Sequence, residues 1–166
     1  MWLATTTGLF QARWSAEIHR EWMSNVLINR PDLSPDRLER TRALMDANVE
    51  DCLVYGYEDL IPGLTLPDPD DRHVLAAAIH AQASVIVTFN LRDFPQSTLM
   101  RYGINVQHPD DFLSLLIENA PEAVCAAAEE HRQSLVNPPK TREQYLETLR
   151  KQGLDQTFKK MLEYCH

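Results

Sequence analysis

The sequence lacks an apolar stretch long enough to cross a membrane. A membrane-spanning helix needs about 20 consecutive apolar residues, and no segment approaches that length, although 44% of the 166 residues are hydrophobic. The start of the chain, MWLATTTGLFQARW, has neither a basic region nor a long apolar run, so it does not resemble a secretory signal. We therefore expect a globular, cytoplasmic protein that does not contact a membrane.

Cysteine and glycine are scarce as well. The three cysteines, Cys52, Cys125 and Cys165, include no CxxC pair, which argues against a disulfide framework or a zinc site and fits a reducing compartment. The five glycines form no phosphate-binding loop, which argues against a dinucleotide-binding domain. HExxH and GxSxG motifs are absent, so the six histidines give no sign of a metalloprotease or a serine hydrolase.

Positive charge is in deficit, because the formal net charge is −8. A protein that coats nucleic acid is usually basic, since its affinity comes from neutralising phosphates. Any role with nucleic acid must therefore be local or must depend on a bound cation.

Patterns typical of strands and helices alternate from about residue 9 to residue 118. Strand-like segments are expected at 9–15, 52–56, 84–90 and 104–107, and helix-like segments at 16–28, 34–47, 70–83 and 108–119. This alternation predicts an α/β layered fold with a mainly parallel sheet.

The rest of the chain has a helical pattern throughout. Thr141 and Gln144 form a plausible capping box for the middle helix of this tail, and Gly153 is expected to end that helix. We therefore divide the chain into a domain at 1–118 and a helical C-terminal extension at 119–166.

Acidic side chains stand where strands of the predicted sheet end, and ligands of open parallel sheets bind beyond such ends. Converging carboxylates repel one another unless a cation lies between them. Their oxygen atoms suit Mg²⁺, which can activate water and stabilise charge on a phosphodiester. The acidic or amide residues at these places are Glu17, Glu21, Asp68, Asp70, Asp71, Asn90 and Asp93.

Each of these residues also has a simpler interpretation. Asp68 or Asp70 is suited to cap the helix that follows, and Glu17 is suited to a solvated helix face, paired with Arg13 or Arg20. Asp93 is suited to form a turn with its own backbone. On composition and spacing alone, both interpretations stay open.

The segment 66–95, LPDPDDRHVLAAAIHAQASVIVTFNLRDFP, resembles the central motif of PIN domains. In that family an aspartate opens a helix with the pattern D-x-x-[IV]-x-A-A, matched here from Asp71 to Ala77. A buried strand then ends in T-x-[ND]-x-x-D-F, matched from Thr88 to Phe94. Upstream, the stretch from Ser15 to Glu21 is similar to the family's S-x-x-x-x-x-E. The resemblance covers about residues 9–118, and the tail is similar to an extension on one subgroup of VapC-like toxins.

The resemblance implies a PIN-like three-layer fold and an Mg²⁺- or Mn²⁺-dependent endoribonuclease, the toxin of a toxin–antitoxin pair. Its partners would be an RNA substrate, a cognate antitoxin protein and, as is common in the family, a second copy forming a homodimer. The implied catalytic and metal-binding residues are Glu21, Asp71 and Asp93, with Asn90 and Asp70 as further metal ligands.

Three arginines are candidates for contacts with RNA phosphates: Arg72, Arg92 and Arg13. For any one of them, the simpler interpretation is a surface residue that aids solubility.

The start of the chain departs from the family pattern. Family members begin with a strand that ends in an aspartate, whereas this chain has no acid before Glu17, and residues 1–4 look like the end of the family's first helix. Three interpretations stay open: a start assigned too late, a truncated gene copy, or a different fold. We favour the first; if the chain truly starts at Met1, we expect weak or no nuclease activity and poor stability, because strand edges would be exposed.

Two other functions compete with the nuclease. One is a catalytically inactive PIN-fold module that pairs with itself or with an antitoxin, whose Arg or Lys side chain would enter the acidic pocket. The other is an α/β domain with an unrelated small-molecule site, to which no motif points.

Overall fold

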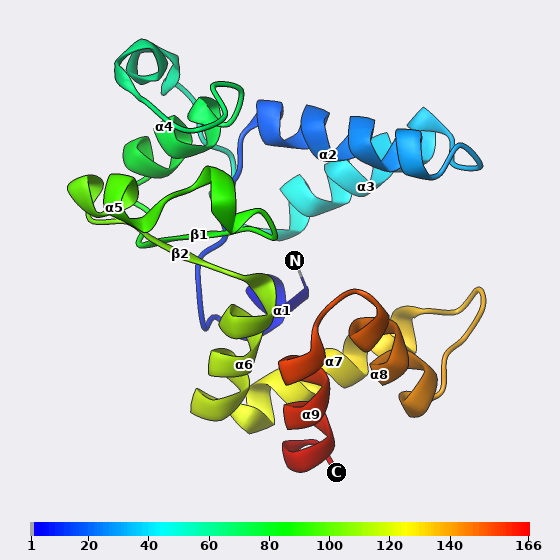
Figure 1. The fold of residues 1–166 in the computed structure, drawn as a ribbon. Helices are drawn as coiled ribbons and strands as arrows, with labels where there is room; N and C mark the ends of the chain where they lie inside the picture. Colours follow the sequence, from blue (N-terminus) through cyan, green and yellow to red (C-terminus); the bar gives the residue numbers. More distant parts are fainter. Residues whose placement is uncertain (1) are drawn as a thin grey trace. The chain divides into compact units, whose positions relative to one another are not determined.

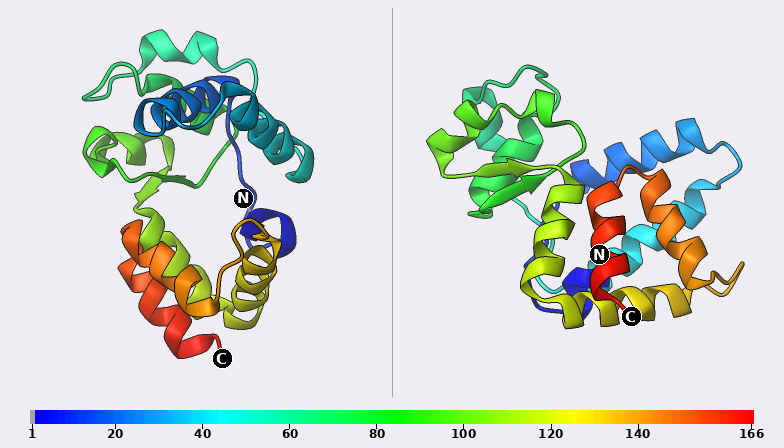
Figure 2. Two further views of the ribbon diagram at one scale, coloured as in Figure 1. Left: turned by 90° about the vertical axis from the view of Figure 1, so that its right-hand side faces the viewer. Right: turned by 60° about the horizontal axis from the view of Figure 1, so that its bottom comes forward.

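The chain folds into two compact units. The computed structural model describes residues 2–166, without the side chains of residues 2 and 5. A first unit contains residues 11–86 and 90–106, and a second unit contains residues 2–10, 87–89 and 107–166 (Figures 1 and 2). Each unit has its own buried apolar cluster.

The first unit combines α-helices with short 3-10 helices. Its α-helices are α2 (Ala16–Asn29), α3 (Pro35–Asn48), α4 (Arg72–His80) and α5 (Gln96–Leu99), and its 3-10 helices are η1 (Glu58–Gly63), η2 (Leu91–Asp93) and η3 (Met100–Tyr102). Ser15 caps α2 by accepting a hydrogen bond of 3.3 Å from the amide of Ile18. The helices predicted at 16–28 and 34–47 are confirmed to within two residues.

The sheet is parallel but smaller than the sequence predicts. Strands β1 (Val85–Val87) and β2 (Asn105–Gln107) pair with each other. The Asn105 amide donates to the Ser84 carbonyl and the Thr88 amide donates to the Gln107 carbonyl, so both strands run in the same direction. The mixed helix-and-strand fold with parallel pairing is therefore confirmed, and the strands predicted at 84–90 and 104–107 are shorter than expected.

The strands predicted at 9–15 and 52–56 are reduced to one isolated parallel bridge between Trp14 and Leu53. It rests on two hydrogen bonds, of 2.8 Å from the Trp14 amide to the Cys52 carbonyl and 2.9 Å from the Val54 amide to the Trp14 carbonyl. Asp51 and Gly56 have positive φ values of 51° and 74°. The backbone therefore leaves the extended conformation at both ends of the second segment, which limits the pairing.

The core of the first unit holds α4 against β1 and the turn that follows. Leu75 and Ala76 of α4 and Leu99 of α5 are fully buried, and Ile86 of β1 and Phe94 lie in the same cluster. Each large side chain buried here contributes about 1.5–3 kcal/mol. Burial therefore fixes the start of α4 and the 90–94 turn, which carry the acidic residues.

The second unit is helical. Its helices are α1 (Trp2–Thr6), α6 (Pro109–Asn119), α7 (Pro121–Ser134), α8 (Arg142–Lys151) and α9 (Asp155–Tyr164). Helix α1 agrees with the helical end expected at residues 1–4, except for Met1, which lies outside the described residues. The capping box of Thr141 and Gln144 is confirmed, and Gly153 follows α8 with a φ of 80°.

Helix α6 packs against α9, and their buried residues share one cluster with α7 and α8. The predicted domain boundary at residue 118 stays a prediction. Among the residues that the structure describes, no helix combines the length and apolarity needed to cross a membrane.

A buried aspartate of α6 caps α9. Asp110 is 5% exposed, and its two carboxylate oxygens accept hydrogen bonds of 2.8 Å from the backbone amides of Gln156 and Thr157. These amides lie in the first turn of α9, where backbone donors have no partner within the helix. Leu154, which occupies the cap position, offers no side-chain acceptor. Asp110 thus supplies from another helix the cap that the local sequence lacks.

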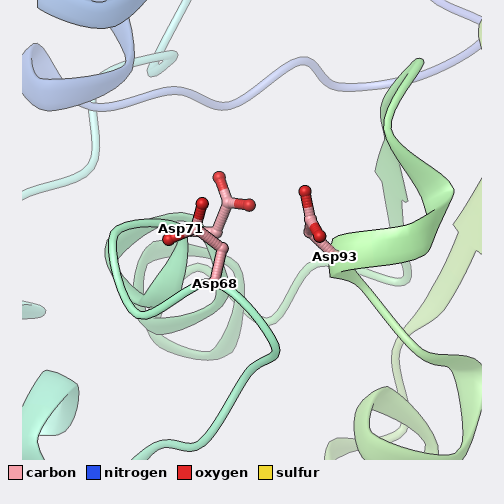
Figure 3. A group of neighbouring side chains, drawn as sticks. All are labelled: Asp68, Asp71 and Asp93. Atoms are coloured by element: carbon pink, nitrogen blue, oxygen red, sulfur yellow. The ribbon is translucent and has the colours of Figure 1, made fainter.

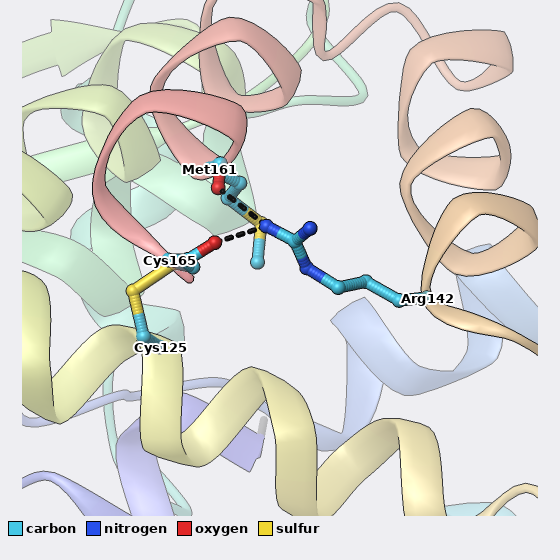
Figure 4. The surroundings of a disulfide bond; sticks show 4 residues. All are labelled: Cys125, Arg142, Met161 and Cys165. Carbon is cyan, nitrogen blue, oxygen red and sulfur yellow. Dashed lines mark hydrogen bonds between the residues drawn. A yellow bond between two sulfur atoms is a disulfide. The ribbon is translucent and has the colours of Figure 1, made fainter.

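The expectation of no disulfide is wrong. Cys125 of α7 and Cys165, which follows α9, are disulfide-bonded, with their Cα atoms 5.4 Å apart (Figure 4). They are separated by 40 residues in the sequence, and the packing of α7 and α9 brings them together, so spacing along the chain gave no sign of the pair. Arg142 of α8 also donates to the carbonyls of Met161 and Cys165 at the same helix end. Cys52 is a buried free cysteine.

Candidate metal centre

Three aspartates of the first unit converge. One carboxylate oxygen from each of Asp68, Asp71 and Asp93 lies within 4.8 Å of the others. Asp71 is the N-cap of α4, Asp68 lies in the loop just before it, and Asp93 faces them from the end of η2 (Figure 3). Asp93 is 22 or more positions away from the other two aspartates in the sequence. The three nevertheless form one small acidic cluster, which we call the aspartate cluster.

The carboxylate of Asp71 is not used to cap the helix that it starts. Asp71 occupies the N-cap position of α4, yet its side chain makes no capping hydrogen bond. Asp68 instead accepts a hydrogen bond of 2.9 Å from the Asp70 amide, as in an Asx turn. The interpretation of Asp68 or Asp70 as the helix cap is therefore wrong. The side chain of Asp71 is left for another role at the positive end of the helix dipole.

The cluster concentrates negative charge around Asp71. Burial raises the pKa of the Asp71 carboxyl above its ordinary value, and the charges of Asp68, Asp93 and Glu21 raise it further, while His73 lowers it. A shift with these causes means that the ionised carboxylate lacks compensating positive charge. A cation placed among these oxygens would supply that charge.

Glu21 reaches this region from α2. Its Oε1 atom lies 2.8 Å from Nε2 of His73, the third residue of the Asp71-Arg72-His73 run. Glu21 does not belong to the group of three within 4.8 Å, but it is near enough to raise the pKa of Asp71. The structure thus brings the three residues predicted as catalytic, Glu21, Asp71 and Asp93, to one region.

A buried network fixes the helix that carries Glu21. His19 is 1% exposed, and its Nδ1 accepts a hydrogen bond of 2.8 Å from Nε1 of Trp22. Because Nδ1 is an acceptor, Nε2 carries the proton and donates to Asp46 over 2.9 Å. Asp46 also accepts a hydrogen bond of 2.8 Å from Nε1 of Trp14. These contacts hold α2 to α3 and to the parallel bridge, and so set the position of Glu21.

Two predicted ligands lie at the edge of the cluster. The side-chain amide of Asn90 donates to the Asp93 carboxylate, so Asn90 orients a member of the cluster. Asp70 is exposed, and its carboxylate is outside the group of three. Asp68, another of the acidic candidates in the sequence, is the third member of the group instead of Asp70.

The three candidate arginines belong to the same unit. Arg72 directly follows Asp71, and its Nε donates to the Pro69 carbonyl over 2.8 Å. Arg92 directly precedes Asp93 on η2 and is exposed. Arg13 donates to the side chain of Gln11 over 3.1 Å.

Glu17 pairs with Arg20 on the surface of α2, as the simpler interpretation of that residue supposed.

Sequence reasoning found no role for His73. The residue is 7% exposed, and its Nδ1 is the buried side-chain polar atom that has no hydrogen-bond partner within the described part of the chain. Its position two residues after Asp71 is the one available signal, and that signal cannot be separated from ordinary helix packing without the structure.

The donor set fits a hard divalent cation. Each of the three clustered groups offers a carboxylate oxygen, the type of ligand that Mg²⁺ and Mn²⁺ prefer. All three groups of the aspartate cluster are carboxylates. Its chemistry would therefore depend on a cation held by carboxylates, with water as the attacking group.

Comparison with known proteins agrees with this arrangement. Residues 2–92 match a family model described as PIN domain, and residues 109–163 match one described as VapC50 C-terminal domain. The chain is 41% identical over 98 residues to a protein of Mycobacterium tuberculosis (strain ATCC 25618 / H37Rv) named "putative ribonuclease VapC50". That alignment covers 59% of this chain and 57% of the relative, so the chain spans little more than half of the relative's length.

No solved structure matches the chain. The PIN match spans residues 2–92 of 166, which is more than half of the chain. The chain therefore belongs to the PIN domain family.

Proposed function

We propose that this protein is an endoribonuclease that depends on Mg²⁺ or Mn²⁺ and acts as the toxin of a toxin–antitoxin pair. The observation that carries the proposal is the convergence of Asp68, Asp71 and Asp93 within 4.8 Å. Membership of the PIN family and the name of the mycobacterial relative, a putative ribonuclease, support the choice of RNA as substrate.

In this proposal the carboxylates of Asp71 and Asp93 hold the cation, with Glu21 as a further ligand and Asp68 beside them. Asn90 keeps the Asp93 carboxylate in place through its side-chain amide. Asp70 remains a more distant candidate. The chemistry that a divalent cation supplies when bound there is Lewis acidity toward a phosphodiester and a lowered pKa of water.

The three candidate arginines are proposed to bind RNA phosphates. Arg72 and Arg92 each adjoin a clustered aspartate in the sequence, and Arg13 precedes the helix that carries Glu21. Because the protein has a formal charge of −8, local positive charge is needed to bring phosphates to carboxylates.

The test is cleavage of RNA by the purified chain with Mg²⁺ or Mn²⁺ and with a chelator. Asp71→Asn removes one clustered charge with little change of shape. We expect it to lower the rate by at least about 100-fold, because loss of a residue that only supports a metal ligand already costs about 10–100-fold. Asp59→Asn, an exposed aspartate of η1 in the same unit, is the matched control and keeps the wild-type rate. Cleavage that survives chelation or that is equal in Asp71→Asn and wild type contradicts the proposal.

The proposed partners are RNA, a cognate antitoxin protein and a second copy of the chain in a homodimer, all in the cytoplasm. The antitoxin and the homodimer rest on the family resemblance of the sequence. Sedimentation velocity tests the homodimer directly: a single species with the mass of one 19.1 kDa chain contradicts it.

A second candidate is a non-catalytic module that binds a basic peptide. The raised pKa of Asp71, which reflects burial and neighbouring negative charges, favours any cation, including a guanidinium group. An arginine-containing peptide that binds wild type but not Asp71→Asn, in a protein that neither binds Mn²⁺ nor cleaves RNA, would select this candidate.

A further inference from the structure

One contact links Glu21 to the helix that carries Asp71. Nε2 of His73 lies 2.8 Å from Oε1 of Glu21, and the two residues are 52 positions apart in the sequence. His73 stands in the first turn of α4, two residues after its N-cap Asp71. Helix α4 therefore provides both Asp71 itself and the group that contacts Glu21.

The surroundings of His73 define which nitrogen donates. Nδ1 of His73 is buried and has no partner among the described residues. A carboxylate can only accept hydrogen bonds, so the contact requires the proton on Nε2. Nε2 of His73 therefore donates a hydrogen bond to Glu21, whereas Nδ1 has no partner among the described residues.

We propose that His73 is a positioning residue that holds the Glu21 carboxylate for the divalent cation. This inference rests on the proposed function of the aspartate cluster. His73 does not contact the cation or the RNA in this account; it acts through Glu21. Hydrogen bonds that fix ligand side chains commonly tune metal sites in this way.

Exposure explains why Glu21 needs a fixed partner. The Glu21 side chain is 42% exposed, whereas the side chain of His73 is 9% exposed. A half-exposed glutamate samples many rotamers, and ordering such a side chain costs conformational entropy. A bond to a buried ring on a packed helix limits this motion before any cation arrives.

A purely structural role for His73 makes a different prediction. If the ring only fills space beside Leu75 and Ala76, an aromatic residue without nitrogen would replace it at no cost to the site. An unpartnered buried nitrogen carries a desolvation penalty, so His73→Phe, which removes that nitrogen, is expected to fold. The positioning role and the space-filling role therefore predict different metal affinities for His73→Phe.

The test measures the dissociation constant of Mn²⁺ by calorimetry, on the full chain. We expect His73→Phe to weaken binding by about 10–100-fold, the usual effect of removing a hydrogen bond to a metal ligand. His73→Gln, whose amide can donate to Glu21, should recover most of this loss. His80→Phe, at the exposed other end of α4, is the matched control and leaves the affinity unchanged.

A double-mutant cycle identifies Glu21 as the residue through which His73 acts. In a Glu21→Gln background, adding His73→Phe should weaken Mn²⁺ binding no further, because the two changes remove one shared interaction. An equal loss in both backgrounds, or no loss from His73→Phe in the wild-type background, overturns the inference. Absence of Mn²⁺ binding by wild type instead overturns the proposed function, and this inference with it.

A metal-free measurement tests the contact by itself. At a pH where histidines are neutral, nitrogen NMR should show His73 of wild type as the tautomer protonated at Nε2, and Glu21→Ala should shift this signal. A proton on Nδ1, or a signal that does not respond to Glu21→Ala, overturns the inference whatever the protein does with Mn²⁺.

Discussion

The two units use aspartates at helix starts in opposite ways. Asp110, in the second unit, accepts two backbone hydrogen bonds from α9. Burial raises the pKa of Asp110, but the hydrogen bonds from Thr157 and Gln156 outweigh it, and the net pKa is lowered. Asp71, in the first unit, makes no capping bond, and burial together with its acidic neighbours raises its pKa. The Asp110 carboxylate is satisfied by backbone donors. The Asp71 carboxylate is the one that we propose to bind a cation.

The contrast extends to the rest of each unit. The second unit is held by a disulfide, a capping box and the Arg142 contacts at the end of α9. The sheet has only two strands of three residues, and the first unit adds one isolated bridge. Binding sites commonly retain groups that the fold does not satisfy. The first unit thus has the features of a site, and the second has those of a stabilised support.

Loss of the disulfide is expected to have the largest effect on stability. Cys125 and Cys165 close a loop with a sequence separation of 40, for which the loop-entropy model gives about 4 kcal/mol. Cys125→Ser should lower the free energy of unfolding of the second unit by about this amount, measured by urea denaturation. Cys165→Ser and reduction of wild type should give the same value. Equal stability of reduced and oxidised protein would show that the bond adds nothing to the support.

Removal of the cap from α9 is expected to have the next largest effect on stability. Asp110→Ala breaks two hydrogen bonds between a charged acceptor and backbone amides and leaves those amides without a partner, at a cost of about 3 kcal/mol. The control is Asp111→Ala, because Asp111 is exposed and bonds only to the side chain of Gln156. We expect it to change the free energy of unfolding by less than about 0.5 kcal/mol. Similar losses for the two variants would remove the special role given to Asp110.

Helix signals in the sequence were reliable where the stabilising contacts are local. The pair Thr141–Gln144 acts within its own helix turn, and the structure contains this capping box as predicted. The convergence of Asp71 and Asp93 also followed from their positions at a helix start and after a buried strand.

What the sequence did not reveal depends on distant partners. The disulfide, the cap that Asp110 gives to α9 and the His73–Glu21 bond join residues separated by 40, 46 and 52 positions. No local pattern marks such pairs, because packing of whole helices brings them together. Strand length was overestimated at 52–56, where the backbone has a positive φ at Gly56 and at the preceding Asp51.

The pH dependence of stability should also distinguish Asp110 from Asp71, and it is the smallest of the effects that we expect. The folded-state pKa of Asp110 is lowered from 3.8, so its stabilisation is present above pH 3.8 and is lost as the pH falls through the lower folded value. The folded-state pKa of Asp71 is raised from 3.8, so its unfavourable contribution is present above that folded value. It is relieved as the pH falls toward 3.8.

Hydrogen exchange at several pH values measures these opposite trends separately in each unit. Asp71→Asn should remove the acid-side gain in the first unit, and Asp110→Asn should reduce the acid-side loss in the second. Parallel trends in the two units, unaffected by either substitution, would contradict the contrast between the two carboxylates.

The most direct measurement is the anomalous scattering of Mn²⁺ in crystals of this protein. We predict one anomalous peak among the carboxylates of Asp71, Asp93 and Asp68, and no peak there in Asp71→Asn. Crystals that contain Mn²⁺ and show no peak among these side chains, or that show the carboxylates directed to separate parts of the surface, would contradict the account.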